Sequence, residues 1–300
     1  MNLNNKPDLR ILKKIAEESG LAEFWLGGST TYYEAARSIG VIFNCKDYDL
    51  AIKGNKKDYN AIKEIIQKHG FQIIKSRPYY LKFKKAFQII AKKGLITLDT
   101  AIVNELSYLG HFNWECIFWH FPSGRIYDPY NALDTIRQKK LIPVISPKEE
   151  NPFILTSRFL NLCARFDINF CKDKKLYAFA KSLAKLTKNW AATDSFHGKY
   201  AKGHSYFGIL QAIIRSKERN KFIRRLQKSG ILNSMFPEIS QKLKTSGKDI
   251  KGIKTAKAPE DIVRCLRHFL KDDKKELQNL NQRFILISNR LKKNSKNIKR

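Results

Sequence analysis

The pattern of apolar and polar positions divides the chain into a first half of mixed character and a second half that is mostly helical. Apolar residues at helical spacing predict helices over residues 8–19, 29–39 and 56–69. Between these helices, short apolar runs at 22–26 and 47–52 predict buried strands. Alternating strands and helices of this kind are typical of a small mixed sheet covered by helices.

The remaining elements follow the same division. In the first half we expect further strands at 71–74, 79–83, 87–91, 95–103 and 114–121, with a turn over 92–94. Beyond the segment Pro143–Pro152, apolar spacing predicts helices almost throughout. Their expected ranges are 152–170, 173–187, 205–216, 218–229, 259–271 and 274–291.

This change of character sets the predicted domain organisation. We expect an α/β head with a small mixed sheet over residues 1–145, an all-α body over 146–291 and a polar, basic tail over 292–300. A hydrophobic content of 43% with 12% aromatic residues is enough for packed cores and excludes a disordered chain.

The charge balance indicates an anionic partner. The sequence holds 58 Lys and Arg against 27 Asp and Glu, a formal net charge of +31. Such a field attracts polyanions, so nucleic acid is the favoured partner and an acidic membrane surface is the second choice. Compositional bias towards lysine is an alternative source of part of this excess, although it does not account for the scarcity of acidic residues.

Two further features bear on the location of the protein. No apolar run reaches the roughly 18 residues of a membrane span, and the first residues lack the apolar core of a signal peptide. The 5 cysteines are widely spaced and include no CxxC pair, so we expect reduced thiols and no zinc site. The sequence therefore predicts a cytoplasmic protein without a membrane span, and nothing in it indicates an obligate protein partner.

The most informative stretch combines a glycine pair with two carboxylates. Gly27 and Gly28 follow a short apolar run, and a predicted helix begins at Ser29. Glycines let a backbone approach a bulky anion, and the amides at a helix start bind phosphate. Asp47 and Asp49 are two positions apart on a predicted strand and therefore point to one face. Because Mg²⁺ is held by carboxylates together with substrate phosphates, this stretch predicts a site for a nucleoside triphosphate and a metal.

Asp99 is the third candidate carboxylate. It lies in the otherwise apolar run 95–103, where a lone acid would be costly to bury. If this strand pairs beside 47–52, its carboxylate joins the other two, and two Mg²⁺ ions could activate a hydroxyl and stabilise leaving pyrophosphate. The structural alternatives are a solvated turn for Asp47 and Asp49 and an edge-strand acid for Asp99.

These residues resemble the nucleotidyltransferase superfamily of DNA polymerase β, and more closely its bacterial poly(A) polymerase and tRNA CCA-adding enzyme (class II) branch. The specific feature is Gly-Gly-Ser followed by Asp-x-Asp. The segment 124–136 is similar to the branch's G-x-I-x-D-P-F-G-G-L-E-D-L sequence, and 150–153 is similar to its E-D-P-x-R neck sequence. Residues 229–239 are similar to a part of its helical body, so the resemblance covers roughly residues 22–240 of a divergent chain.

The resemblance implies a polymerase β-type fold and Mg²⁺-dependent transfer of a nucleotide, from ATP or CTP, to the 3′ end of an RNA such as tRNA. It implies that Asp47, Asp49 and Asp99 are the catalytic and metal-binding residues. The nucleotide-binding residues that we expect are Gly27, Gly28, Ser29, Thr30, Arg125, Asn151 and Arg158.

The sequence also departs from the branch. The link between the glycine pair and Asp-x-Asp is longer than usual there. The branch's R-R-D-F-T-I-N sequence would fall at 109–115, where only the phenylalanine is kept. Its base-reading Asp and Arg correspond to Asn151 and Ile154, with Arg158 and Arg165 as substitutes on one helix face. Ordinary CCA addition is therefore not the expectation.

Basic residues of the predicted body are the candidate RNA-binding groups. Phosphate contacts from lysine and arginine give affinity without sequence choice, and they predict steep salt dependence. The alternative for each cluster is a solvated or packing face. The residues that we expect to bind RNA are Lys199, Lys202, Arg215, Arg224 and Arg225.

Two other functions fit parts of the sequence. The long link before Asp-x-Asp also resembles the fukutin-like phosphocholine transferases, in which case the acceptor would be a small-molecule or protein hydroxyl. The lost base-reading residues would suit a non-catalytic RNA-binding module on a degenerate transferase scaffold. The three retained acids argue against this module, and the helical body argues against the fukutin-like alternative.

Overall fold

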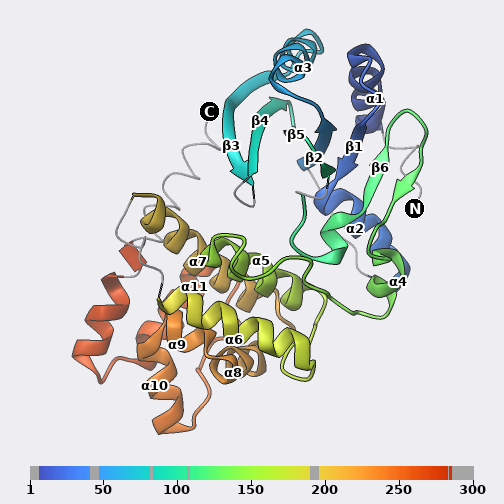
Figure 1. The fold of residues 1–300 in the computed structure, drawn as a ribbon. Helices are drawn as coiled ribbons and strands as arrows, with labels where there is room; N and C mark the ends of the chain where they lie inside the picture. Colours follow the sequence, from blue (N-terminus) through green and yellow to red (C-terminus); the bar gives the residue numbers. More distant parts are fainter. Residues whose placement is uncertain are drawn as a thin grey trace. The chain divides into compact units, whose positions relative to one another are not determined.

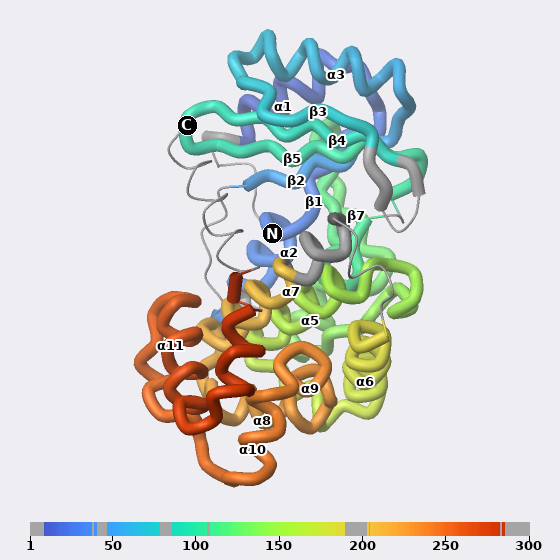
Figure 2. The backbone as a smooth tube through the Cα atoms, turned by 90° about the vertical axis from the view of Figure 1, so that its left-hand side faces the viewer, coloured from blue at the N-terminus to red at the C-terminus, as the bar shows by residue number. Residues whose placement is uncertain are grey.

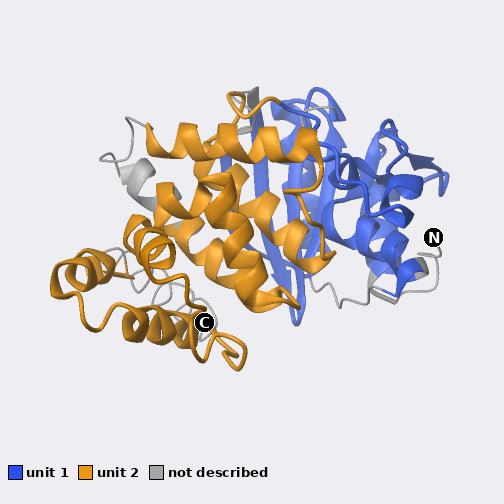
Figure 3. Ribbon diagram, turned by 90° about the horizontal axis from the view of Figure 1, so that it is seen from below, with its two compact units in different colours: residues 1–145 blue, residues 146–300 orange. Residues whose placement is uncertain are grey.

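The computed structural model describes residues 7–40, 47–81, 84–106, 109–189, 196–282 and 284–285. Figure 1 shows strands and helices in the first half of the chain and helices alone in the second half. The expected α/β half followed by an all-α half is therefore confirmed. The contacts divide the chain into unit 1, Met1–Ile145, and unit 2, Ser146–Arg300 (Figure 3). The predicted tail at 292–300 lies outside the described residues.

Unit 1 is built on a seven-stranded mixed sheet in the order β3-β4-β5-β2-β1-β6-β7. The strands β2 and β5 are parallel, and the other neighbouring pairs are antiparallel. The two parallel strands lie in the interior of the sheet, next to the short strand β1. The strands span Phe24–Gly27 (β1), Asp47–Lys53 (β2), Gln72–Leu81 (β3), Lys84–Lys93 (β4), Ile96–Val103 (β5), Phe118–His120 (β6) and Ile126–Tyr127 (β7).

Two helices, α1 (Pro7–Ser19) and α3 (Lys56–Lys68), lie together on one side of the sheet, as Figure 2 shows. Their apolar sides supply Leu12 and Ile62 to a core that also contains Leu50 of β2. A capping box at Asn55 fixes the start of α3, and Gly70 follows its end with a positive φ of 79°. This side of the sheet is therefore apolar and covered.

Short elements accompany the opposite face of the sheet. They are the helix α2 (Gly28–Ala36) with its 3₁₀ extension η1 (Arg37–Ile39), the 3₁₀ turn η3 (Asn113–Cys116) and the helix α4 (Ala132–Arg137). A smaller core lies here, formed by Trp25, Ala51, Cys116 and Phe118. Because this core reaches only part of the face, the polar residues of β2 and β5 on it remain half-buried or exposed.

Three predicted strands differ from the structure. The strands expected at 71–74 and 79–83 form one strand, β3, which continues through Pro78 opposite Phe87. Proline is compatible with this position because β3 is the edge strand, where an N–H can be missing on the open side. The strand expected at 114–121 exists only as β6, since the preceding residues form η3 instead.

Unit 2 consists of helices that pack on a second core. They are α5 (Pro152–Arg165), α6 (Lys174–Lys188), α7 (Phe196–Arg215), α8 (Arg219–Ser229), α9 (Ile231–Met235), α10 (Pro237–Ser246) and α11 (Pro259–Phe269). Helix α5 ends before the predicted residue 170, because Asp167 has a left-handed φ of 53°. No helix among the described residues has the length and apolar character needed to cross a bilayer.

The crossing of α5 and α7 is the tightest contact of unit 2. A Cβ on Gly208 of α7 would lie 1.8 Å from Oγ of Ser157 on α5. The side-chain amide of Asn161 donates to the carbonyl of Ser157 at 2.8 Å and to that of Gly208 at 3.2 Å. The missing side chain therefore lets two backbones approach, and the shared amide fixes their register.

Candidate nucleotidyl-transfer site

The carboxylates of β2 and β5 meet on the less covered face of the sheet. In the parallel pair, Asp49 lies directly opposite Asp99, and Asp47 lies opposite Thr97. Tyr48 between the two acids of β2 is buried in the core under α1 and α3, so Asp47 and Asp49 face away from those helices. The expectation that the strand of Asp99 pairs beside the strand of Asp47 and Asp49 is confirmed.

The glycine pair lies against the same carboxylate. Gly27 ends β1 opposite Asp49, and Gly28 opens α2 with a φ of 61°. A Cβ on Gly28 would lie 2.0 Å from Oδ2 of Asp49, so no other residue fits there without displacing that side chain. The backbone N–H of Ser29 donates to the same Oδ2 at 3.2 Å. The start of α2 and the Asp49 carboxylate therefore form one continuous polar site.

Threonine hydroxyls fix the position of α2. Thr30 donates through its hydroxyl to the carbonyl of Asp47 at 3.1 Å. The hydroxyl of Thr31 contacts the carbonyls of Gly28 at 2.9 Å and Ile117 at 2.8 Å. Both threonine side chains are buried. Their bonds hold the first turn of the helix beside the start of β2.

Gln88 is part of this site and was not expected from the sequence. Its side-chain amide donates to Oδ1 of Asp99 at 2.9 Å and to Oδ2 at 3.2 Å. Gln88 lies on β4, one strand beyond β5, and its only sequence signal is a polar residue inside an apolar run. A carboxylate that accepts two bonds from one amide has a restricted orientation, so Gln88 positions Asp99.

The donor set suits Mg²⁺ when substrate phosphates complete it. Carboxylate oxygens are preferred by this hard cation, and Mg²⁺ sites commonly use one or two carboxylates together with phosphates and water. Asp49 and Asp99 provide two such carboxylates on adjacent strands. Among the described residues no group of three His, Cys, Asp or Glu side chains is placed to hold a metal ion. The structure thus brings Asp49 beside Asp99 and leaves Asp47 exposed, while the metal-binding role of all three stays a prediction.

Arg125 is placed on the same unit by an aromatic contact. Its guanidinium lies 5.7 Å from the ring centre of Trp25, a cation–π arrangement. Trp25 is opposite Ala51 in the pairing of β1 with β2, two residues along β1 from Gly27. The exposed Arg125 is therefore held against Trp25, and its contact with a nucleotide stays a prediction.

Two segments have structural roles here: 124–136, which resembles a sequence of the polymerase branch, and 109–115, which departs from one. In the segment 124–136, the carboxylate of Asp128 accepts from the backbone N–H groups of Ala132 at 2.7 Å and Leu133 at 2.9 Å, which caps α4. In the segment 109–115, Asn113 is buried, and its side-chain oxygen accepts from the N–H of Ile142 at 2.8 Å. Both segments thus fix loops of unit 1.

The predicted residues at the start of unit 2 are placed on α5. Asn151 caps this helix, since its side-chain oxygen accepts from the N–H of Phe153 at 3.0 Å. Arg158 is exposed on the same helix. The geometry therefore gives Asn151 a structural contact, and base recognition by Asn151 and Arg158 stays a prediction.

The expected RNA-binding residues differ in the contacts that they make. Arg224 donates to the carbonyls of Leu243, Gly247 and Lys248 at 3.2, 2.7 and 2.8 Å, which satisfies the end of α10. Arg215 donates to the side-chain oxygen of Asn161 at the α5–α7 crossing. Among the described residues, Arg225 makes two long ion pairs, at 4.0 Å to Asp167 and 3.9 Å to Glu218. Lys199 and Lys202 belong to α7, and their side chains lie outside the described part.

Unit 1 is a mixed sheet that carries a Gly-Gly turn beside carboxylates on adjacent strands, and unit 2 is helical. Comparison with solved structures confirms this fold. A CCA-adding enzyme in complex with CTP matches 94% of the chain with a TM-score of 0.59 and 13% identity. The apo form of a CCA-adding enzyme matches 93% with a TM-score of 0.60 and 15% identity.

A third solved structure, a tRNA-processing enzyme in an apo form, matches 90% of the chain with a TM-score of 0.54 and 15% identity. The chain spans 69%, 66% and 79% of the length of these three proteins, in the order given. No protein-family model and no curated protein matches the sequence. At this identity the likeness establishes the fold.

Proposed function

We propose that the protein is a metal-dependent nucleotidyltransferase that adds nucleotides from a nucleoside triphosphate to the 3′ end of an RNA. The observation that carries this proposal is the register of β2 with β5, which puts Asp49 beside Asp99 next to the start of α2. Like charges on adjacent strands destabilise a sheet, so their retention at this point is best accounted for by a cation that the protein binds in use.

The roles of the residues follow from their positions. Asp49 and Asp99, with Asp47 as the predicted third ligand, would hold Mg²⁺, and bound Mg²⁺ would polarise the triphosphate and the acceptor hydroxyl. Gly27 and Gly28 let the backbone pass close to Phe118 and Asp49, and the amides at the start of α2 would donate to the triphosphate. Asp99, oriented by Gln88, would align the acceptor hydroxyl of the RNA. It would take the proton of this hydroxyl as the hydroxyl oxygen attacks the α-phosphorus of the triphosphate. Pyrophosphate is then the leaving group.

The identity of the nucleotide rests on more distant groups. A solved protein of this fold was crystallised with CTP, so ATP and CTP are the substrates to test first. Arg125 on Trp25 would contact the triphosphate or the base, and Arg158 is the second candidate. The chain keeps the Glu of the neck sequence as Glu150 but neither its Asp nor its Arg. We therefore infer that the base-reading surface is rebuilt, and we assign no order of nucleotide addition.

The acceptor is proposed from charge and fold together. A net charge of +31 favours a polyanion, and the helical unit 2 matches proteins whose solved forms include a tRNA-processing enzyme. RNA in the cytoplasm is therefore the proposed partner. A small-molecule acceptor, as in the fukutin-like alternative, would leave the charge and the helical unit without a use.

Incorporation of labelled nucleotide is the test. The purified protein is incubated with total RNA, Mg²⁺ and each of the four labelled triphosphates in turn, with and without a chelator. We expect labelling of RNA 3′ ends that needs Mg²⁺ and is lost in Asp49→Asn and Asp99→Asn, while circular dichroism stays unchanged. Labelling that persists at the same rate in both variants would refute the proposal.

A non-catalytic RNA-binding module is the second candidate, and one observation favours it. Asp99 already accepts two bonds from Gln88, and Asp49 accepts one from Ser29, so protein donors satisfy part of each carboxylate. A module of this kind would bind RNA with no incorporation of any triphosphate and no affinity for nucleotide. The same labelling experiment, together with nucleotide titration, separates the two functions.

A further inference from the structure

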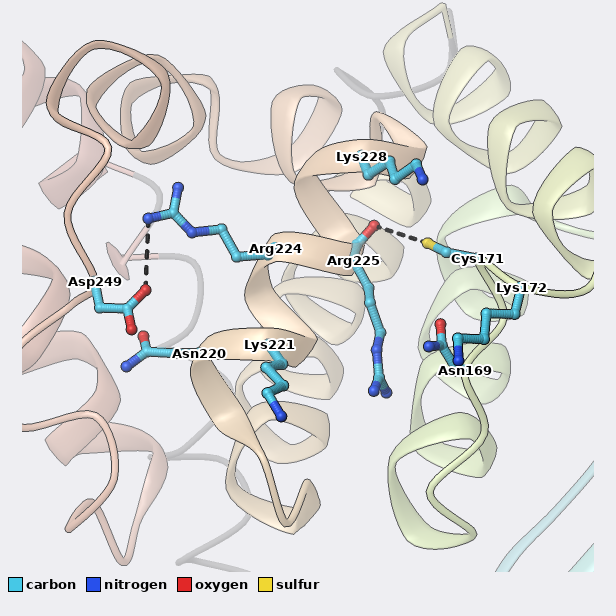
Figure 4. A pocket seen from close by; sticks show the side chains of 9 residues that line it. All are labelled: Asn169, Cys171, Lys172, Asn220, Lys221, Arg224, Arg225, Lys228 and Asp249. Carbon is cyan, nitrogen blue, oxygen red and sulfur yellow. Dashed lines mark hydrogen bonds and ion pairs between the residues drawn. The ribbon is translucent and has the colours of Figure 1, made fainter.

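Unit 2 contains a basic pocket far along the chain from the carboxylates of β2 and β5. It is an open cavity of about 410 Å³ between α8 and the segment 169–172 (Figure 4). We call this cavity the basic pocket, and its cationic lining consists of Lys172, Lys221, Arg224, Arg225 and Lys228. Asp249 is the acidic residue of the lining, and it is paired with Arg224 at 3.5 Å.

The burial of the apolar side of α8 explains why these cations lie together. Phe222, Ile223 and Leu226 are buried, which fixes the orientation of the helix. Lys221, Arg225 and Lys228 recur at helical spacing, and Lys172 approaches from the facing segment. In Figure 4, Arg225 and Lys172 extend from opposite sides into the space between the two segments.

The cations of this region differ in how far the protein already neutralises them. Arg224 donates to three backbone carbonyls and pairs with Asp249, so much of its hydrogen-bonding capacity is used within the protein. Lys221 pairs with Glu218, and the hydrogen bond from Lys221 holds the pKa of this carboxyl below its usual value. Among the described residues, Lys172 and Lys228 make no ion pair. Their charges remain for an anion from outside.

A neutral hydrogen-bond donor completes the lining. The side-chain oxygen of Asn220 accepts from the N–H of Ile250 at 3.3 Å, which turns its amide group towards other partners. Lysine ammonium groups, an arginine fork and an amide are the donors that bind phosphate oxygens. Small-molecule sites are enclosed, whereas this cavity is open and its charged groups are cationic apart from Asp249, so a phosphate that belongs to a passing chain suits it better.

We propose that the basic pocket binds a backbone phosphate of the RNA, an assignment that rests on the proposed use of RNA as acceptor. The contacts carry no base information, so the pocket acts as an anchor that adds affinity for many sequences. Because it lies in unit 2, its loss weakens RNA binding without removing any group of the carboxylate site.

Charge removal tests this anchor. The double variant Lys172→Gln/Lys228→Gln is compared with Lys271→Gln/Lys274→Gln, which removes two exposed lysines of the same unit outside the pocket. Binding of a labelled RNA is followed by fluorescence anisotropy without nucleotide or Mg²⁺. We expect about tenfold weaker binding for the pocket variant and a salt slope lower by about 1.4, since each single-strand contact contributes about 0.7. Equal losses in the two variants would overturn the proposal.

Cys171 offers an independent readout inside the pocket. Its Sγ lies 3.6 Å from the carbonyl of Arg225, and Cys265, half-buried in the same unit, is the matched thiol outside the pocket. Burial raises the pKa of both thiols, so maleimide labelling is run at mildly alkaline pH and read by peptide mass spectrometry. We expect RNA to slow the labelling of Cys171 and not of Cys265.

Inorganic phosphate at the same phosphate concentration should give no protection. Protection by inorganic phosphate but not by RNA would reassign the pocket to a small anion and overturn the RNA anchor. The variant Asp49→Asn separates this outcome from failure of the proposed transfer reaction. It should lose incorporation while keeping RNA affinity and the protection of Cys171, because it changes no group of the pocket.

Discussion

The carboxylate face of unit 1 and the basic pocket of unit 2 are built in opposite ways. The carboxylate face consists of Asp47, Asp49 and Asp99. The carboxylates are short side chains on interior strands, so the backbone register alone sets their spacing. The pocket consists of long, flexible cations on one helix and one loop, and their availability depends on which acids and carbonyls lie nearby. The spacing of carboxylates is therefore a stronger indication of a functional site than the number of basic residues.

Neutralising the carboxylates should have the largest effect. In Asp49→Asn and in Asp99→Asn we expect incorporation to fall by at least about a hundredfold, since a charged metal ligand is lost. Stability without Mg²⁺ should stay equal or rise by up to about 1 kcal/mol, because two like charges on adjacent strands are relieved. Labelling kinetics and thermal unfolding measure the two effects. A loss of activity caused by unfolding would remove the contrast with the basic pocket.

The glycine turn should give the next largest effect. Gly28→Ala places a Cβ against the carboxylate of Asp49 at a φ of 61°, so we expect more than about tenfold lower activity and about 3 kcal/mol lower stability. Gly20→Ala is the control, because Gly20 has a φ of 63° and nothing within 4 Å of its Cβ position. It should cost about 1–2 kcal/mol from backbone strain alone and leave activity unchanged. Equal activity losses would exclude a specific role for Gly28.

Gln88→Leu should have an intermediate effect. It removes the amide that orients Asp99 and keeps a side chain of similar size, so we expect a loss of about ten- to a hundredfold in rate. The apparent affinity for Mg²⁺ should fall as well, whereas RNA binding measured by anisotropy should not change. Gln88→Glu, which keeps the length but adds a like charge beside Asp99, should be at least as slow. A normal metal affinity in both variants would reduce Gln88 to a packing residue.

The smallest effects are expected for variants of two neighbouring arginines, which should differ in whether they lower stability or RNA affinity. Arg224→Gln removes three bonds to the end of α10, so we expect about 2 kcal/mol lower stability and RNA affinity within about twofold of the original. Arg225→Gln should change stability by less than about 0.5 kcal/mol, because its ion pairs are long, and should weaken RNA binding severalfold. Chemical denaturation and anisotropy give both values. The reverse ranking would contradict the distinction between structural and available cations.

The sequence predicts the carboxylate face better than the rest of the molecule. Asp47 and Asp49 follow from the alternation of a strand, and Asp99 stands out as an acid in an apolar run. Gln88 could not be found in this way, because its contact with Asp99 depends on the register of β4 with β5. A single glutamine in a strand has no local feature that distinguishes it from a solvated residue.

Errors in the predicted fold also come from tertiary contacts. The strands at 71–74 and 79–83 were predicted as separate, but an edge position lets β3 continue through Pro78. The residues from Trp114 onwards were expected to form a strand, yet the indole N–H of Trp114 donates to Thr135 at 3.2 Å and η3 forms instead. Arg224 and Arg225 are adjacent in sequence and differ only through their distant neighbours.

Calorimetric titration of Mg²⁺ in the presence of a nucleoside triphosphate tests the central claim most directly. The claim is that the carboxylates paired across β2 and β5 hold a metal together with the triphosphate. The quantity compared is the heat of Mg²⁺ binding to the protein with its triphosphate, after subtraction of the heat of Mg²⁺ binding to free triphosphate. This heat should be observed for the original protein and should disappear in Asp49→Asn/Asp99→Asn, while Lys172→Gln/Lys228→Gln retains it in full. Equal Mg²⁺ binding by the double carboxylate variant, or no binding by the original protein with any triphosphate, would contradict the account.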